Sequence, residues 1–431
     1  MAEQGKISFF SAVLMSINII VGSFIFVAPQ RMAVMAGSMS FLSWVLAGIL
    51  LLPIVLIVAQ AARVFPGEGG FYLYCKTGLN ETAGFLSIWA YLLGYLGTAG
   101  TITVIIRERL VSQAGIGAFD QHPYLFYAGF IILLSLLNLL SIELISKIQS
   151  FVTLLKLTPL FIVAGLIIFY WNPTITYSAS NLAGLGATLP LAFFGFYGFE
   201  SCCSISHMIK GGSTQASRVM LLAFGVTVVL YTIYHLGVLN IMGTDNLIAF
   251  GSGAFPNFLG LSPYAAESLM LFIACAIMLS LLNTTYGAAL TNITNLATLS
   301  SQRSILGARL LAKRTSNGTP INAVILHGIV LFALVALIGH VTILNSITNF
   351  GVGTAILLVL VTMIAYNAQR KNILMLLIAC AGMCSLTALF YYSWLQAGDD
   401  TAMRFLYLTP FLVGFPAGWI MYKTLKCCKQ A

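Results

Sequence analysis

Long apolar runs separated by short polar or turn-forming segments dominate the chain. Most runs reach or exceed the roughly 20 residues that an α-helix needs to cross the hydrocarbon core of a bilayer. The pattern predicts an all-α polytopic membrane protein with twelve transmembrane helices. The run at 264–298 is too long for one straight crossing, so we expect it to continue into the following loop. The predicted spans are 8–34, 39–62, 83–106, 122–142, 148–171, 187–208, 217–242, 264–298, 320–340, 344–366, 372–395 and 403–423.

Composition narrows the class of protein further. Of the 431 residues, 59% are hydrophobic and only 7% are charged. A soluble domain carries about 25% charged residues, so a soluble enzyme, a nucleic-acid binder and a disordered protein are all excluded. We expect membrane lipids, and no nucleic acid, as partners. The eight cysteines show no CxxC spacing and lie singly or as neighbours, so the sequence predicts no metal and no cofactor.

The position of the charges predicts the orientation of the chain. Fifteen of the twenty Lys and Arg residues fall on the side of the predicted spans that holds the N-terminus, and four fall on the other side. Cytoplasmic loops of membrane proteins are enriched in Lys and Arg. We therefore expect both termini in the cytoplasm, and a location in a bacterial cytoplasmic (inner) membrane.

Two predicted spans carry internal interruptions. The first contains Gly22 and Ser23 ahead of Pro29, and the sixth contains Gly195, Gly198 and Glu200. Taken singly, such glycines mark close helix packing. They occupy matched positions if the chain is one transporter domain, 1–431, built from two five-helix repeats and two further helices. Matched interruptions of this kind are typical of inverted-repeat transporters. The repeats would cover 8–171 and 187–366, and the further helices 372–423.

Three segments carry a family resemblance. Residues 22–26, GSFIF, followed by Pro29, resemble the GSGIF…P signature of the amino acid–polyamine–organocation transporters. Residues 65–74, FPGEGGFYLY, are similar to the FPxxGGxYxY loop of that family, and residues 196–201, FYGFES, to its F-x-G-x-E-S motif. In the first three spans the likeness is nearest to the basic amino acid/polyamine antiporter branch, which includes the arginine–agmatine antiporter.

The resemblance implies a LeuT-like 5+5 inverted repeat plus two C-terminal helices, alternating access, and an amino acid or amine substrate. The substrate carboxylate would meet Gly22, Ser23 and Phe24, and its ammonium group the carbonyls of the sixth span. Phe24 replaces the last glycine of the family signature and should narrow the pocket. The residues implied for substrate binding are Gly22, Ser23, Phe24, Phe193, Phe194, Tyr197 and Gly198, and those implied for gating are Tyr91 and Phe194.

Two charges lie inside predicted spans. Lys156 is either a snorkelling residue near a helix end or a fixed cation at the place that sodium takes in sodium-coupled relatives. Glu200 is either a structural acceptor or a group that takes up protons. Our hypothesis is that both contribute to proton coupling or gating. Thr98, Thr101, Asn283, Thr284 and Thr285 either line the cavity or bond neighbouring helices, and packing is the commoner role.

The function expected is secondary active transport of amino acids by alternating access. Proton-coupled symport and exchange of amino acids or amines both stay open, and either a monomer or a homodimer is compatible. No Walker motif and no catalytic cluster is evident, so we expect no enzyme activity. The alternative is a transporter-like membrane sensor or channel without coupled transport, because a fold does not determine a function.

Overall fold

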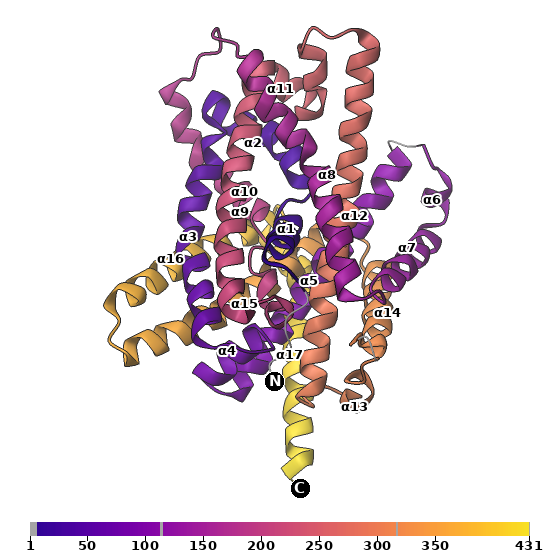
Figure 1. Ribbon diagram of the computed structural model, residues 1–431, viewed down its shortest axis with the longest axis vertical. Coiled ribbons are helices and arrows are strands. Elements are labelled where there is room, and N and C mark those ends of the chain that lie inside the picture. The colour runs from indigo at the N-terminus through magenta and orange to yellow at the C-terminus, as the bar shows by residue number, and fades with distance from the viewer. Residues whose placement is uncertain (1–6, 113–114, 316–317, 431) are drawn as a thin grey trace.

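The computed structural model describes residues 7–112, 115–315 and 318–430, apart from the side chains of Ser23, Cys428, Lys429 and Gln430. These residues form helices joined mostly by short loops, and a single β-bridge joins Ile7 to Ile209. The described part of the chain begins and ends in the lower half of Figure 1. We call this the terminal end of the molecule, and the opposite one the far end.

Eight of the described helices are long and apolar enough to cross a membrane. Three apolar helices are shorter: α1 (Phe9–Ile20), α7 (Pro123–Leu137) and α14 (Ile321–Leu337). An all-helical membrane protein is therefore confirmed, while the count of twelve spans stays a prediction. The eight long helices are α3 (Leu42–Val64), α5 (Glu81–Ser112), α8 (Ile142–Phe169), α10 (Gly212–Met242), α12 (Pro263–Ser301), α15 (Val341–Gln369), α16 (Ile373–Gln396) and α17 (Thr401–Gln430).

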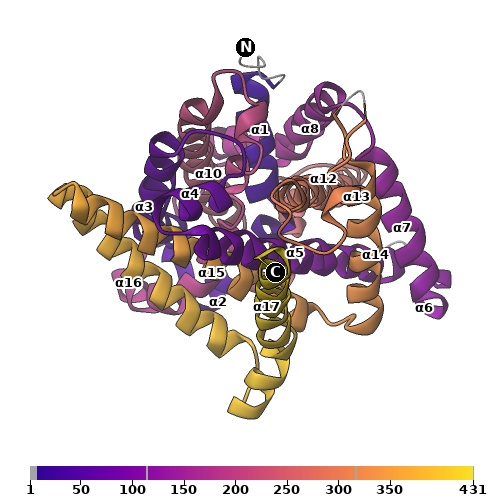
Figure 2. The ribbon, with the colours of Figure 1, turned by 90° about the horizontal axis from the view of Figure 1, so that it is seen from below.

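Helices α5 and α15 pack tightly against each other near the middle of the molecule, and α16 projects from one edge (Figure 2). Glycines allow this close approach, because a Cβ atom on Gly351 would lie 2.5 Å from the backbone nitrogen of Gly94. Small residues at crossings are the usual way for membrane helices to approach closely. The run that we expected to continue beyond 298 forms one helix, α12, of 39 residues.

The first predicted span is broken in the middle. Helix α1 ends at Ile20, and the chain continues through Val21 and Gly22 into the short helix η1 (Ser23–Phe26) and then α2 (Ala28–Ala36). Pro29 lies in the first turn of α2, where its missing N–H costs nothing. The break leaves carbonyls at the end of α1 without helical partners, so side chains must satisfy them.

The sixth predicted span is broken as well. Helix α9 (Leu185–Gly195) gives way to turns that lead to η4 (Ser201–Cys203) and η5 (Ser206–Met208). Gly198 has φ +104°, and a Cβ atom there would lie 2.6 Å from Cγ2 of Ile19. Only glycine suits this backbone and this contact. The two broken spans therefore touch each other at their interruptions.

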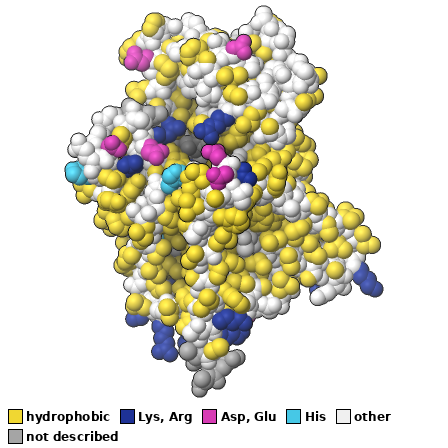
Figure 3. Space-filling model, turned by 180° about the vertical axis from the view of Figure 1, so that it is seen from behind, with side chains coloured by type: hydrophobic (Ala, Val, Ile, Leu, Met, Phe, Trp, Pro, Cys, Tyr) yellow, Lys and Arg dark blue, Asp and Glu magenta, His cyan; other side chains and the backbone are white. Residues whose placement is uncertain are grey.

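The surface is largely apolar between its two ends. Figure 3 shows hydrophobic side chains over most of the lower part of one face, basic groups at the terminal end, and charged groups gathered around a hollow higher up. An apolar belt of this extent suits contact with lipid. The smaller helices lie in the connections: α4 (Phe71–Gly78), α6 (Ala118–Gln121), η2 (Gly37–Met39), η3 (Ala179–Gly184), α11 (Thr244–Phe250), η6 (Ser252–Phe258) and α13 (Ala308–Leu311).

Candidate functional site

A cavity of about 550 Å³, measured as the space open to the centre of a water molecule, lies at the two breaks. Its wall includes Gly22 and Phe24 from the first break, and Phe194, Tyr197 and Gly198 from the second. It extends along α5 as far as Arg109 in the last turn, so it opens toward the far end. A cavity of this size accommodates a small organic solute.

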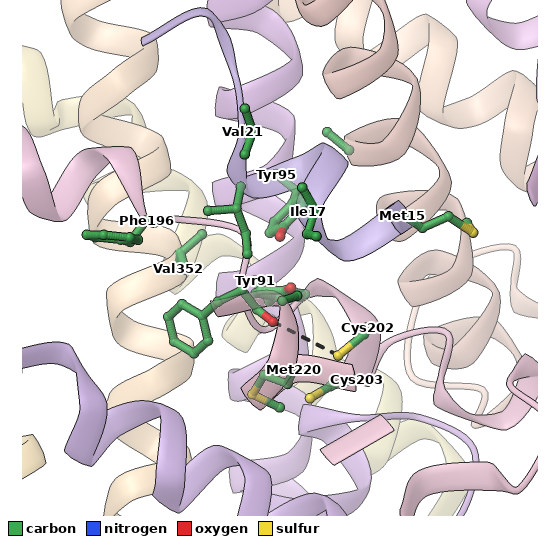
Figure 4. Close-up of a cluster of buried hydrophobic side chains, with 14 of the residues drawn as sticks. Met15, Ile17, Val21, Tyr91, Tyr95, Phe196, Cys202, Cys203, Met220 and Val352 are labelled. Carbon is green, nitrogen blue, oxygen red and sulfur yellow. Dashed lines mark hydrogen bonds between the residues drawn. The ribbon is translucent and has the colours of Figure 1, made fainter. Parts of the chain in front are cut away.

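Glu200 lies at the floor of the cavity, with none of its surface exposed. Its Oε1 atom accepts hydrogen bonds from the hydroxyls of Tyr91 at 3.2 Å and Tyr95 at 3.0 Å. Its Oε2 atom accepts one from the backbone N–H of Gly198 at 3.2 Å. Figure 4 shows Tyr91 between Val21 and Ile17 on one side and Cys202 and Cys203 on the other, with Tyr95 beside Ile17. The carboxyl group thereby joins the second break to α5.

Aromatic rings form the apolar part of the wall. The rings of Phe24 and Phe194 meet edge to face with centroids 5.1 Å apart, and Phe194 is 6.1 Å from Tyr197. Phe24 is the residue that replaces a glycine of the family signature. Its ring lines the cavity and reduces the space between the two breaks.

Lys156 satisfies the carbonyls that the first break exposes. Its Nζ atom donates to the backbone oxygens of Asn18 at 2.7 Å and Val21 at 2.6 Å, and to Asn18 Oδ1 at 2.6 Å. A fourth acceptor, Thr284 Oγ1, lies at 3.3 Å and also lines the cavity. Because Lys156 is only 1% exposed, the snorkelling alternative does not fit. The ammonium group instead links α8 to α1 and α12.

Other side chains share this capping. Ser280 Oγ donates to the carbonyl of Val21 at 3.2 Å, and Thr284 Oγ1 donates to that of Asn18 at 3.1 Å. The hydroxyl of Tyr231 on α10 donates to the carbonyl of Ile20 at 3.0 Å. Three helices thus hold the open end of α1 in place.

The predicted site residues divide into two groups. Phe193 is buried behind the cavity wall, and Tyr91 and Lys156 lie beneath it. The side chain of Ser23 lies outside the described residues. Of the five polar residues on predicted spans, Asn283 bonds to α8, and Thr285 bonds to Leu281 on its own helix. The predicted residues that line the cavity are Gly22, Phe24, Phe194, Tyr197, Gly198, Glu200, Thr98, Thr101 and Thr284.

Sequence reasoning missed the outer part of the wall. Arg31 on α2 and Arg109 on α5 line the cavity toward the far end, and together with Glu200 they are its only charged residues in the described part of the chain. The run Asn345–Asn349 on α15 supplies amide and hydroxyl groups. That polar run inside an apolar span was the available signal, whereas nothing in the sequence pairs Arg31 with Arg109.

The terminal end beneath the cavity is closed by contacts between distant segments. Glu68 accepts a hydrogen bond from Arg314 at 2.9 Å, and the ring of His207 lies 3.6 Å from the same carboxylate. The backbone of Ile7 exchanges hydrogen bonds of 3.0 and 2.9 Å with residues 208 and 210. Gly70, at φ +49°, lets the preceding loop pack on η4, since a Cβ atom there would lie 2.9 Å from the carbonyl oxygen of Cys203. We call Glu68, Arg314 and His207 the terminal-end latch.

These features define a helical membrane protein with a solute-sized cavity at two broken helices. A family model described as amino acid permease matches residues 7–416, almost the whole chain. The protein therefore belongs to the amino acid permease family, a family of membrane transport proteins and not of enzymes.

Individual relatives are more distant. The chain is 23% identical to the serine/threonine exchanger SteT of Bacillus subtilis (strain 168) over 58% of each chain. It is 19% identical to the aspartate-proton symporter of the same organism, over 57% of this chain and 51% of the relative. An uncharacterized transporter of Mycobacterium bovis, Mb2022c, is also 19% identical, over 56% of this chain and 54% of the relative. The chain thus spans between half and three fifths of the length of these relatives.

Proposed function

We propose that this protein is a secondary active transporter that moves amino acids across the cytoplasmic membrane by alternating access. One observation carries the proposal: the two broken helices meet at one cavity that opens toward one end of the molecule and is closed by the latch at the other. Family membership and relatives that include an exchanger and a symporter support it. The terminal end, where the basic residues gather, would face the cytoplasm.

The two breaks suggest how a zwitterion would bind. The backbone of Gly22 and Phe24, at the start of the η1–α2 segment, would take the carboxylate, because helix N-termini carry partial positive charge. The last carbonyls of α9 would take the ammonium group, because helix C-termini carry partial negative charge. Phe194 would close over the substrate. We further propose that residues 8–171 and 187–366 are the two inverted repeats of this arrangement.

The charges of the wall favour a substrate with a carboxylate over a polyamine. Arg31 and Arg109 line the outer part of the cavity and make its described charges positive on balance, and the carboxylate of Glu200 at the floor accepts hydrogen bonds from two tyrosines and a backbone amide. A cleft with low-dielectric walls concentrates the field of its charged groups. Neutral or acidic amino acids are therefore favoured over the basic substrates of the arginine–agmatine branch.

Proton-coupled symport is the mechanism that the buried charges support. Lys156 reaches the cavity through Thr284, and Glu200 reaches it directly, so binding of the substrate and of a proton can influence each other. Exchange without protons is the second candidate, and the similarity to a serine/threonine exchanger favours it.

Transport by the purified full-length protein in proteoliposomes tests the proposal. Labelled serine, aspartate, arginine and putrescine would each be offered in counterflow and under an imposed pH gradient. We expect serine or aspartate to be transported, with net uptake driven by an inward proton gradient alone. Uptake that needs substrate on the opposite side would identify an exchanger. Transport confined to arginine or putrescine would contradict the substrate class, and saturable binding without uptake would favour a sensor.

A further inference from the structure

A second, much smaller cavity lies between α1, α8, α12 and η4. Its volume, by the same measure, is about 10 Å³. Four of its lining residues carry polar side chains: Ser16 on α1, Gln149 on α8, Ser201 at η4 and Thr291 on α12. Gln149 is seven positions before Lys156 on α8 and Thr291 seven positions after Thr284 on α12, so the cavity lies roughly 10 Å nearer the terminal end.

Polar atoms of this cavity have no partner among the described protein atoms. Ser16 Oγ and both Nε2 and Oε1 of Gln149 are buried without a hydrogen bond. The two residues are 2% and 0% exposed, respectively. Buried polar groups in folded proteins are almost always satisfied by protein or by ordered water. Two residues with three such atoms at one small cavity therefore indicate a ligand that both donates and accepts hydrogen bonds.

The size and chemistry of the cavity suit one water molecule. A buried water needs about 10–15 Å³ by this measure and two to four polar partners. The amide of Gln149 offers a donor and an acceptor, and the hydroxyls of Ser16, Ser201 and Thr291 can act as either. A metal cation fits less well, because the described lining residues include no carboxylate but do include an amide donor.

Hydrogen bonds connect this cavity to Lys156. Lys156 donates to Asn18 Oδ1, and the Nδ2 atom of Asn18 donates to the carbonyl of Asn283 at 2.9 Å. The Nδ2 atom of Asn283 donates in turn to the carbonyl of Gln149 at 3.2 Å. The residue that caps the broken end of α1 is thus joined, through two amides, to the residue that projects into the small cavity.

We propose that this cavity is a binding site for a single water molecule that holds α1 and η4 against α8 and α12. The water completes the hydrogen bonds of Ser16 and Gln149 and so stabilises the closed terminal end. When α1 moves away from α8, the site loses one wall and the water exchanges with the solvent there. This inference goes beyond the proposed function and does not depend on which substrate is carried. Only its accessibility test relies on alternating access.

The direct test is a structure of the full-length protein in lipid nanodiscs at a resolution that shows ordered water. We expect a water peak within about 3.2 Å of the Gln149 amide and of at least one of the three hydroxyls. A cavity without density in a closed terminal end would overturn the proposal.

Two matched variants provide the second test. Thr291→Val removes a hydroxyl at the cavity. Thr294→Val removes a hydroxyl from the same helix, but that hydroxyl donates to the carbonyl of Leu290 in α12 at 2.9 Å. Of the two threonine variants, we expect only Thr291→Val to lower the melting temperature. Gln149→Met should lower it too. If the cavity held no water, Gln149→Met would remove two unsatisfied polar atoms and the melting temperature would rise.

Alkylation of Cys202 and Cys203, both buried in η4, reports opening of the terminal end. In a background without the other cysteines that a reagent could reach, Gln149→Met should raise the alkylation rate from that side about threefold. The rate in Thr294→Val should equal that of the parent. An unchanged alkylation rate in Gln149→Met would overturn the proposal that this water stabilises the closed terminal end. The cysteines replaced by serine are Cys275, Cys380, Cys384, Cys427 and Cys428.

Discussion

At the scale of single residues, Phe24 marks the clearest departure from the family signature. Its ring contacts Phe194 across the cavity, and both side chains line the wall. Phe26, two residues further along η1, instead packs against Tyr234 at 5.6 Å and does not line the cavity. The pair offers a matched comparison of a wall residue with a packing residue in the same short helix.

Phe24→Gly should widen the cavity and admit larger amino acid side chains. We expect competition by bulky amino acids to increase in the counterflow assay. The affinity for the smallest substrate should fall, because Phe194 loses its edge-to-face contact with Phe24, a pair worth about 0.5–1.5 kcal/mol. Phe26→Ala should lower stability without changing the order of preference among substrates. Identical substrate preferences in Phe24→Gly and the parent would contradict the position of Phe24 in the binding site.

Lys156→Met should yield a folded protein of lower stability that no longer follows a proton gradient. The carbonyls of Asn18 and Val21 keep the hydroxyls of Thr284 and Ser280 as donors. Only Asn18 Oδ1 loses its donor, at a cost of about 1–3 kcal/mol. Thermal unfolding and gradient-driven uptake measure the two effects.

Lys147→Met is the control, because Lys147 lies on the same helix with its side chain exposed. We expect it to behave as the parent in both assays. Uptake by Lys156→Met that still responds fully to the pH gradient would remove Lys156 from the coupling mechanism.

The motifs predicted the inner wall of the cavity but not the outer wall. Gly22 and Gly198 show in the sequence where the helices break. The breaks require particular backbone conformations, so they can be recognised from neighbouring residues alone. The motifs did not predict the contact of Phe24 with Phe194, because the two residues belong to different breaks. Arg31 and Arg109 reach the same cavity from two helices that are far apart in the sequence, so no local pattern reveals them.

At the scale of elements, the crossing of α5 and α15 depends on glycines. Gly351→Ala would place a Cβ atom 2.5 Å from the backbone nitrogen of Gly94, where neither helix can yield without moving. Overpacking of this kind costs about 1–3 kcal/mol. We expect a lower melting temperature and a smaller yield of folded protein in detergent.

Gly165→Ala on α8 is the matched control. No atom of the described residues lies within 4 Å of the Cβ position at Gly165, so the substitution meets open space. Because alanine favours a helix over glycine by about 1 kcal/mol, stability should be equal to or higher than that of the parent. If Gly351→Ala and Gly165→Ala had the same melting temperature, the close approach of α5 and α15 would not limit stability.

Apolar length predicts where helices lie better than where they stop. The predicted run at 264–298 corresponds to α12, and that at 344–366 to α15, with ends that differ by a few residues. The short helices α6, α11 and α13 were not predicted, because their few turns are held by neighbouring segments and show no apolar period of their own. The depth of Lys156 in its predicted span did not decide between snorkelling and burial, because the groups that it bonds lie outside its own helix.

At the scale of the whole molecule, the latch at the terminal end should set the balance between its closed and open forms. The side chains of Glu68 and Arg314 are 47% and 37% exposed, so their ion pair contributes only about 0.2–1 kcal/mol. Glu68→Gln should therefore raise the alkylation rate of Cys202 and Cys203 by at most about fivefold. Added salt should raise the rate in the parent and have less effect in the variant.

Glu81→Gln controls for the loss of a surface ion pair as such. Glu81 contacts Lys426 at 3.0 Å with similar exposure, but it joins α5 to α17 rather than to a broken helix. We expect no change in alkylation. Equal rates in the Glu68 and Glu81 variants would show that the latch does not control the terminal end. The side toward which the cavity opens was not predictable from the sequence, because it depends on such weak contacts between distant loops.

The bridge between Ile7 and Ile209 has a practical consequence for handling the protein. The chain is hydrogen-bonded to the segment beyond the second break as soon as its described part begins. A fusion partner or affinity tag joined directly to residue 7 would crowd that bridge, and we expect it to weaken the bridge's hydrogen bonds. Helix α17 instead extends away from the body of the molecule (Figure 1). Tags, immobilisation surfaces and fluorophores belong at the C-terminal end.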